Sequence, residues 1–159
     1  MTDVYPPDCF RKQVLRLSAQ RTRIVDGEGM FIRFVSGEMD DNSRVSAGLF
    51  CAVSQLEWID DLPQYEFGLV AELERWFDRN LPSPVEHLPR DLSYERAVCW
   101  FKPTAREHLA RAWELVTILE RNDVLIWTIK SRTTGRVYYE DDVQVFAVPS
   151  RELRSLCRR

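Results

Sequence analysis

The chain has 159 residues with 25 acidic and 22 basic side chains, which gives a formal net charge of −3 at pH 7. Hydrophobic residues make up 45% of the sequence and aromatic residues 11%, which is the composition of a packed globular domain and excludes a disordered chain. A slightly acidic protein lacks the basic field that nucleic-acid-binding domains usually carry, so nucleic acid is not expected as a partner.

Several other classes are excluded by what the sequence lacks. No apolar stretch approaches the length of a membrane span, and the N-terminus carries charges where a signal peptide would be apolar. Phosphate-binding loops, nucleophile elbows and paired CxxC motifs are absent. Cys51 and Cys99 stand in apolar runs, where we expect reduced thiols in the core. We therefore expect a cytoplasmic protein with no membrane contact, no metal and no cofactor.

The first strong element begins at Met30, after the loop sequence DGEG. We expect residues 1–29 to be an N-terminal extension or a docking arm, residues 30–149 to form one domain, and residues 150–159 to be a short basic tail. Alternating apolar residues over 30–36 predict a strand. Apolar residues at helical spacing predict a helix from about 46 to 59 and a second helix that ends near Asn80. A long polar loop follows over residues 81–95.

The elements expected after this loop are a strand over 97–102, a helix over 104–121, and strands over 124–131 and 137–147. Thr104 and Glu107 have the spacing of a capping box at the start of the helix. We predict a right-handed crossover between parallel strands on either side of this helix, and an antiparallel hairpin between the last two strands. The predicted fold is therefore α+β and two-layer, with a mixed four-stranded sheet in the order β-α-α-β-α-β-β and helices mainly on one face.

Glu140, Asp141 and Asp142 interrupt an otherwise apolar strand sequence. Aspartate is a poor strand former, so something specific must hold this segment. We consider three interpretations: a bulge that turns the acids to water, a structural carboxylate at Asp141 paired with Lys102, Arg106 or Arg33, and a catalytic or metal role.

A second cluster stands where the helix over 104–121 begins. Lys102, Arg106 and His108 surround a helix N-terminus, whose free N–H groups favour anions. They predict a site for a phosphate or a carboxylate. The alternative is an ordinary capped helix with solvated bases and a partly buried, hydrogen-bonded His108.

The stretches WFKPTAREH and VYYEDDVQVFAVP resemble those of a group of small, uncharacterised bacterial proteins. Those proteins begin near MFIRF and carry W-F-K, a helix and then Y-E-D-x-x-Q-V-x-A-x-P. The resemblance covers residues 30–149 and leaves out residues 1–29. The group has no established activity, so the resemblance implies no catalytic residue. It draws attention to one cluster: Trp100, Lys102, Glu140, Asp141 and Gln144.

Two functional hypotheses follow. The first is a non-enzymatic protein-interaction or regulatory module that binds another protein or itself, since the aromatic residues Trp58, Trp76, Trp100 and Trp127 exceed what a minimal core needs. The second is an enzyme or a protein that binds a small anion through the helix N-terminus beside the acidic cluster. Its candidate ligand-binding residues are Trp100, Lys102, Arg106, His108, Glu140, Asp141 and Gln144, and its catalytic residues are unknown.

Overall fold

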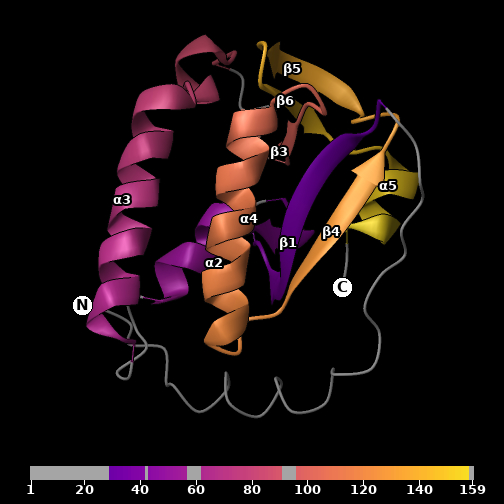
Figure 1. Ribbon diagram of the computed structural model, residues 1–159. Coiled ribbons are helices and arrows are strands. Elements are labelled where there is room, and N and C mark those ends of the chain that lie inside the picture. Colours follow the sequence, from indigo (N-terminus) through magenta and orange to yellow (C-terminus); the bar gives the residue numbers. More distant parts are fainter. Residues whose placement is uncertain (1–28, 42, 57–61, 91–95, 158–159) are drawn as a thin grey trace.

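The computed structural model describes residues 29–41, 43–56, 62–90 and 96–157 (Figure 1). Residues 1–28 of the predicted extension over 1–29 lie outside the described residues, as do residues 57–61. The elements are, in chain order, β1 (Phe31–Met39), β2 (Ser46–Gly48), α2 (Leu49–Leu56), α3 (Gln64–Asn80), the short 3₁₀ helix η1 (Pro84–His87), β3 (Val98–Phe101), α4 (Arg106–Arg121), β4 (Ile126–Ser131), β5 (Arg136–Glu140), β6 (Gln144–Val148) and α5 (Arg151–Leu156).

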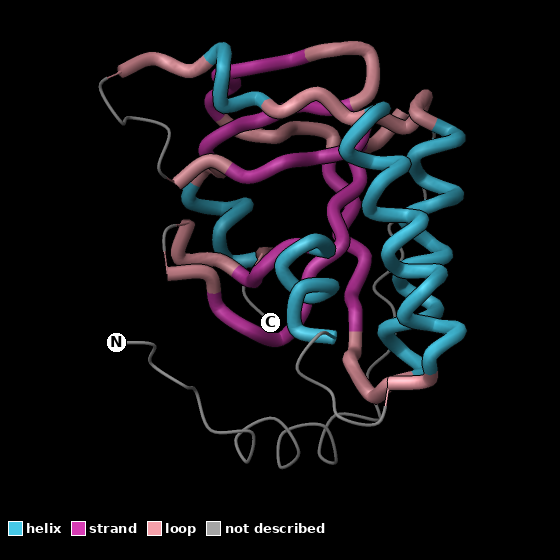
Figure 2. Tube along the Cα trace, turned by 90° about the vertical axis from the view of Figure 1, so that its left-hand side faces the viewer, coloured by secondary structure: helices cyan, strands magenta, loops and turns pink. Residues whose placement is uncertain are grey.

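The strands form a six-stranded sheet that curls into a half-barrel, and every pairing in it is antiparallel (Figure 2). β1 is the central strand. β4 pairs along one of its edges in unbroken register, from Phe31 opposite Ser131 to Ser36 opposite Ile126. β3 and β2 share the other edge of β1, and β6 and then β5 continue the sheet beyond β3. The sheet therefore branches at β1, where one edge serves two short strands.

The α+β class is confirmed, whereas the predicted four-stranded mixed sheet is wrong. Strands β3 and β4 do run parallel to each other, because both pair antiparallel with β1, but β1 lies between them. The predicted hairpin between residues 124–131 and 137–147 does not form. The segment over 137–147 instead turns back on itself as β5 and β6, so it makes a hairpin alone. Its partner is β3 rather than β4.

Two apolar cores lie on opposite faces of the sheet. The helices α2, α3 and α4 cover one face, where they bury Leu56, Phe77 and Leu119 against Phe34 and Phe101. The other face carries a smaller cluster of Val35, Val45, Val98, Trp100, Ile129 and Cys157. Helix α5 lies on this second side of the sheet (Figure 1), and the residue that follows it, Cys157, is fully buried there. The segment predicted as a tail thus packs onto the sheet.

Arg33 joins the two strands that share the edge of β1. Its guanidinium donates one hydrogen bond to the carbonyl of Cys99 in β3 and one to the carbonyl of Ser46 in β2, each at 3.0 Å. The side chain is only 7% exposed. A planar, forked donor suits this place because it can bind two backbone carbonyls at the same time.

Two local predictions are corrected by the structure. Helix α4 starts at Arg106, with Ala105 as N-cap and no capping side chain, so Thr104 and Glu107 do not form a capping box. The cause is the turn before the helix, in which the amide of Ala105 donates to the carbonyl of Lys102. Cys51 and Cys99 are exposed rather than in the core. No helix among the described residues is long and apolar enough to span a membrane.

Candidate functional site

The acidic cluster is the turn of the β5–β6 hairpin. β5 ends at Glu140 and β6 begins at Gln144. The amide of Asp141 donates to the carbonyl of Gln144 at 3.0 Å, which closes the turn. Asp141 Oδ1 in turn accepts from the amides of Val143 at 2.7 Å and Gln144 at 2.8 Å. A short acidic side chain that binds the backbone two and three residues on is what stabilises a turn of this kind.

The second carboxylate oxygen of Asp141 is held by neutral side chains. Oδ2 accepts from the hydroxyl of Tyr139 at 2.9 Å and lies 3.3 Å from Nε2, the side-chain amide nitrogen of Gln144. Desolvation raises the pKa of Asp141. The hydrogen bonds from the backbone amides of Gln144 and Val143, and then those from the two side chains, lower the pKa by more, so the net shift is downward. The hydrogen bond to Asp141 raises the pKa of Tyr139.

No cation pairs with Asp141 among Arg33, Lys102 and Arg106, the three that the sequence suggested as partners. Arg33 binds backbone carbonyls instead. Lys102 Nζ lies 2.7 Å from Glu140 Oε1. Asp141 is therefore a half-buried structural carboxylate, and the turn explains three acids within an apolar sequence.

The helix N-terminus and the acidic cluster do lie side by side. The amide of Lys102 donates to the carbonyl of Val143 at 2.7 Å, and the side chain of Lys102 pairs with Glu140. The Glu140 side chain is 52% exposed, so water screens this ion pair, which contributes at most about 1 kcal/mol. Because Glu140 already pairs with Lys102, an anionic ligand would have to compete with Glu140 for the positive charge.

The other two bases of the cluster have different surroundings. Arg106 is exposed at the start of α4. His108 Nε2 lies 2.8 Å from the carbonyl oxygen of Asn80, and its ring packs against Trp76 with centroids 4.8 Å apart. His108 therefore connects α4 to the end of α3. Lys102 and His108 serve separate structural contacts, and no common anion pocket is built from the three bases.

Gln144 and Trp100 are both buried. Gln144 Nε2 donates to the carbonyl of Pro82 at 2.6 Å, so it fastens the loop after α3 to the hairpin. Trp100 is fully buried in the second core, where its strand pairs with β6 opposite Val145. Within the described part of the chain, no cluster of histidine, cysteine, aspartate and glutamate is placed to hold a metal ion.

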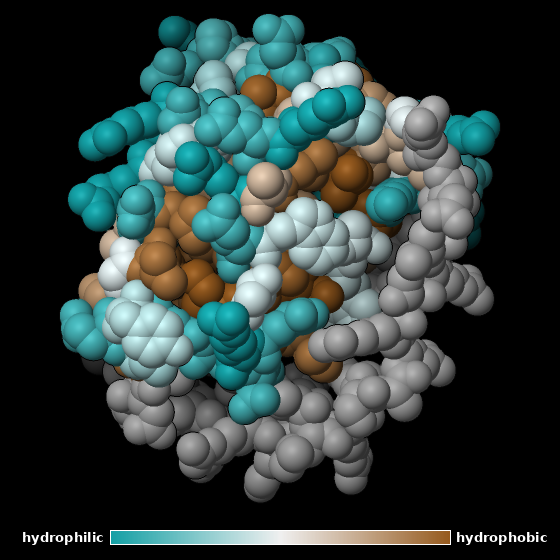
Figure 3. Space-filling model, viewed as in Figure 1, coloured by the Kyte–Doolittle hydropathy of each residue, from teal (hydrophilic) through white to brown (hydrophobic). Residues whose placement is uncertain are grey.

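The structure reveals an apolar surface that the sequence did not single out. Tyr65, Phe67 and Leu69, near the start of α3, are 64%, 49% and 45% exposed, and we call them the α3 surface. At about 100° per residue, Tyr65 and Leu69 lie on one flank of the helix, and Phe67 lies on the opposite flank, beside α2. Figure 3 shows apolar side chains gathered over this helix. The sequence could have indicated these exposed residues, because Tyr65 and Phe67 are large apolar residues outside the buried stripe of Val70, Leu73 and Phe77.

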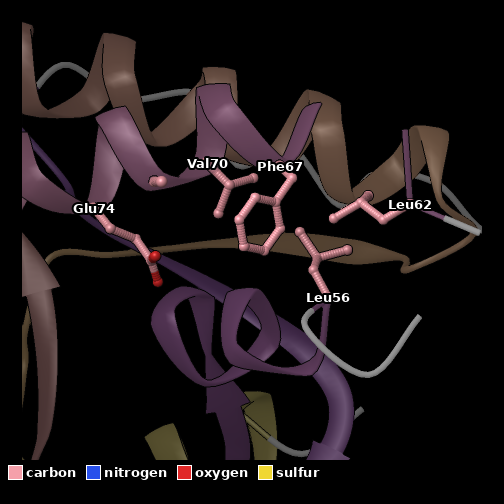
Figure 4. Close-up of a pocket in the computed structure, with 6 residues that line it drawn as sticks. Leu56, Leu62, Phe67, Val70 and Glu74 are labelled. Carbon is pink, nitrogen blue, oxygen red and sulfur yellow. The ribbon is translucent and has the colours of Figure 1, made fainter. Parts of the chain in front are cut away.

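A small cavity lies beside Phe67, between α2 and α3 (Figure 4). Its volume is about 100 Å³, and it is lined by Leu56, Leu62, Phe67, Val70, Ala71 and Glu74. Sites for metabolites are typically several times larger, about 300–1,000 Å³. The cavity can take one aliphatic side chain but not a cofactor.

The tryptophans divide between core and surface. Trp100 is buried, Trp76 and Trp127 are half-buried, and Trp58 lies outside the described residues. Trp113, one of the large apolar residues of α4, is 49% exposed. The comparisons with known proteins add no further constraint: no family model, no curated protein and no solved structure matches this chain.

Proposed function

We propose that the protein is a non-enzymatic interaction module that binds a partner protein through the α3 surface. The observation that carries this proposal is the exposure of Phe67 beside the apolar cavity between α2 and α3, with Tyr65 and Leu69 exposed on the other flank of the same helix. Isolated exposed apolar residues are ordinary, but large ones that gather on one element are characteristic of protein interfaces.

The helix that bears this surface is firmly anchored. Glu66, one residue from both Tyr65 and Phe67, is 3% exposed and accepts a hydrogen bond from Asn122 Nδ2 at 2.7 Å. Arg121 NH1 lies 3.8 Å from the same carboxylate. These contacts attach the first turn of α3 to the last turn of α4. A partner therefore meets side chains on a preformed helix, which reduces the entropy that binding must overcome.

The cavity beside Phe67 indicates the kind of contact the partner makes. Its apolar lining and its volume of about 100 Å³ suit one leucine, isoleucine or methionine side chain inserted between α2 and α3. Such an inserted anchor, surrounded by flatter apolar contacts, is the usual arrangement of an energetic hot spot. The partner is thus a protein segment with one projecting aliphatic residue.

The test compares a double variant, Phe67→Ser with Leu69→Ser, with the wild-type chain as bait in native-cell extract. A matched control removes two exposed apolar side chains elsewhere, Val85→Ser with Val137→Ser. We expect the partner to be retained by the control and lost by the α3 variant. After purification it should bind the α3 variant at least about tenfold more weakly, a difference of about 1.4 kcal/mol. Equal capture by all three proteins would contradict the proposal.

The second candidate function, binding of a small anion, requires that Lys102 be released from Glu140. Lys102 and Glu140 lie 2.7 Å apart at the junction where the sequence placed the site, so a ligand could displace Glu140 from Lys102. A thermal-shift screen with inorganic phosphate, nucleotides and carboxylates tests it, since binding at saturation raises the melting temperature. A shift that Lys102→Ala removes would favour this function over the interaction module.

A further inference from the structure

β4 is the last strand of the sheet beside β1, and it has the features of a strand prepared for pairing. Its six residues, IWTIKS, pair with β1 without a bulge. In the part of the chain that the structure describes, no strand pairs with its outer edge. Proteins usually protect such edges with prolines, bulges or several charges. β4 contains no proline and one charge, that of Lys130.

The opposite end of the sheet is different. β5 has an irregular register between Val137 and Tyr139, and it carries charges at both ends, at Arg136 and Glu140. A bulge disturbs the ladder and increases local twist, so it discourages the addition of another strand. The contrast makes β4 the edge at which the sheet can be extended.

We propose that β4 pairs antiparallel with β4 of a second copy of this chain, about a twofold axis at Thr128. In this register Thr128 faces Thr128 of the second copy, and Trp127 faces Ile129 of the second copy on both sides of the axis. Threonine pairs and pairs of aromatic with β-branched residues are favourable across antiparallel strands. Lys130 faces Ile126 of the second copy, so no like charges oppose each other. The strand is thus complementary to itself.

Trp113 supports the same interface from the helical layer. It projects from α4, is 49% exposed, and meets the ring of Phe34 edge-on with centroids 5.0 Å apart. Phe34 is directly opposite Thr128 in the register of β1 with β4, so both side chains lie on one face of the sheet. Figure 3 shows apolar side chains over β1 on this face. A second copy would extend the sheet beside Trp113 and cover this apolar region.

The other possible occupant of the edge is the chain's own N-terminal segment. β1 begins at Phe31, which lies opposite Ser131 at one end of β4, so the chain enters the sheet at this end of the edge. The two occupants differ in stoichiometry. Pairing between copies depends on protein concentration, whereas pairing within one chain does not.

The experiment is sedimentation equilibrium on the full chain, on Thr128→Glu, on Thr128→Lys and on an equimolar mixture of the two variants. We expect the wild type to be a dimer. Each variant alone places like charges opposite each other at the axis and should dissociate about tenfold more readily. In the mixture, glutamate faces lysine, and dimers should return. The control is Thr133→Glu, the same change at an exposed turn residue outside the strand, which should leave the dimer intact.

Hydrogen exchange on the wild-type chain is a second measurement that needs no variant. The outer amides of β4 should become more protected as protein concentration rises. A wild-type chain that stays monomeric up to its solubility limit would overturn the proposal. If the β4 amides were then protected equally at all protein concentrations, the strand would pair with the N-terminal segment of its own chain. A dimer that survives both single variants would also overturn it, because another surface would hold the copies together.

Discussion

Replacement of Asp141 by asparagine is expected to lower the free energy of unfolding by about 2 kcal/mol at pH 7, because hydrogen bonds to a charged group contribute more than neutral ones. An asparagine oxygen in the place of Oδ1 can still accept from the amides of Val143 and Gln144, but without the charge that strengthens both bonds. The asparagine nitrogen would stand in the place of Oδ2, where the Gln144 amide nitrogen is also a donor. That contact would become unfavourable.

The pH dependence of this difference follows from the lowered pKa of Asp141. A carboxylate with a depressed folded-state pKa stabilises the fold fully above its unfolded pKa of about 3.9 and loses that contribution as pH falls through the folded pKa. The difference in unfolding free energy between wild type and Asp141→Asn should therefore be constant from pH 7 to about pH 5 and shrink below about pH 4.

Urea denaturation at several pH values measures this difference, provided that the slope against urea stays the same in both proteins. The matched control is Asp142→Asn, one residue along the same turn, whose exposed side chain should change stability by less than about 0.5 kcal/mol. A loss below about 0.5 kcal/mol for Asp141→Asn, or one that persists unchanged to pH 2, would refute the role of the carboxylate in the turn.

Four further substitutions test the fold by the same denaturation assay. Gly135→Ala should lower the free energy of unfolding by about 2 kcal/mol or more, because Gly135 has φ +97° and an added Cβ would collide with the backbone at Val148. Gly68→Ala, where the added Cβ would meet open space on α3, should raise the free energy of unfolding by about 0.5–1 kcal/mol. If both substitutions stabilised the protein, or both destabilised it, this expectation would be contradicted. Arg33→Lys should lower the free energy of unfolding by about 1–3 kcal/mol, since an ammonium group cannot donate to the carbonyls of Cys99 and Ser46 in the same geometry. Unchanged stability would show that these two hydrogen bonds are not needed. Lys102→Ala should cost less than about 1 kcal/mol, and the cost should vanish in high salt; a larger, salt-independent loss would mean that the pair with Glu140 is shielded from water.

Helices α3 and α4 could be predicted from the sequence because their apolar residues recur at helical spacing, and this local pattern decides which side of a helix is buried. The strands β1, β3 and β4 were also predicted within a few residues. Their pairing was not, because pairing depends on contacts between distant segments rather than on the pattern within each one. β2 was missed, since three residues are too few to show an alternation.

The hairpin at residues 136–148 shows where local reasoning fails. Its turn contains no glycine, proline or asparagine, and its two aspartates stand within an alternation of apolar residues that continues on both sides, so the sequence suggested one interrupted strand. The turn forms because one carboxylate, that of Asp141, satisfies two amides at once. The bond from Gln144 to Pro82 adds a contact across 62 positions of the chain, which no spacing rule reveals.

The sequence by itself thus determined the α+β class and the helical pattern of α3 and α4, and it raised the proximity of Lys102 to the acidic cluster as a hypothesis. The tertiary structure decided that Lys102 is neutralised by Glu140, that His108 serves a contact between helices and that Trp113 is exposed. The physical reason is the same in each case. Residue type sets which groups must be buried or hydrogen-bonded, but only the folded chain sets which partner reaches each group.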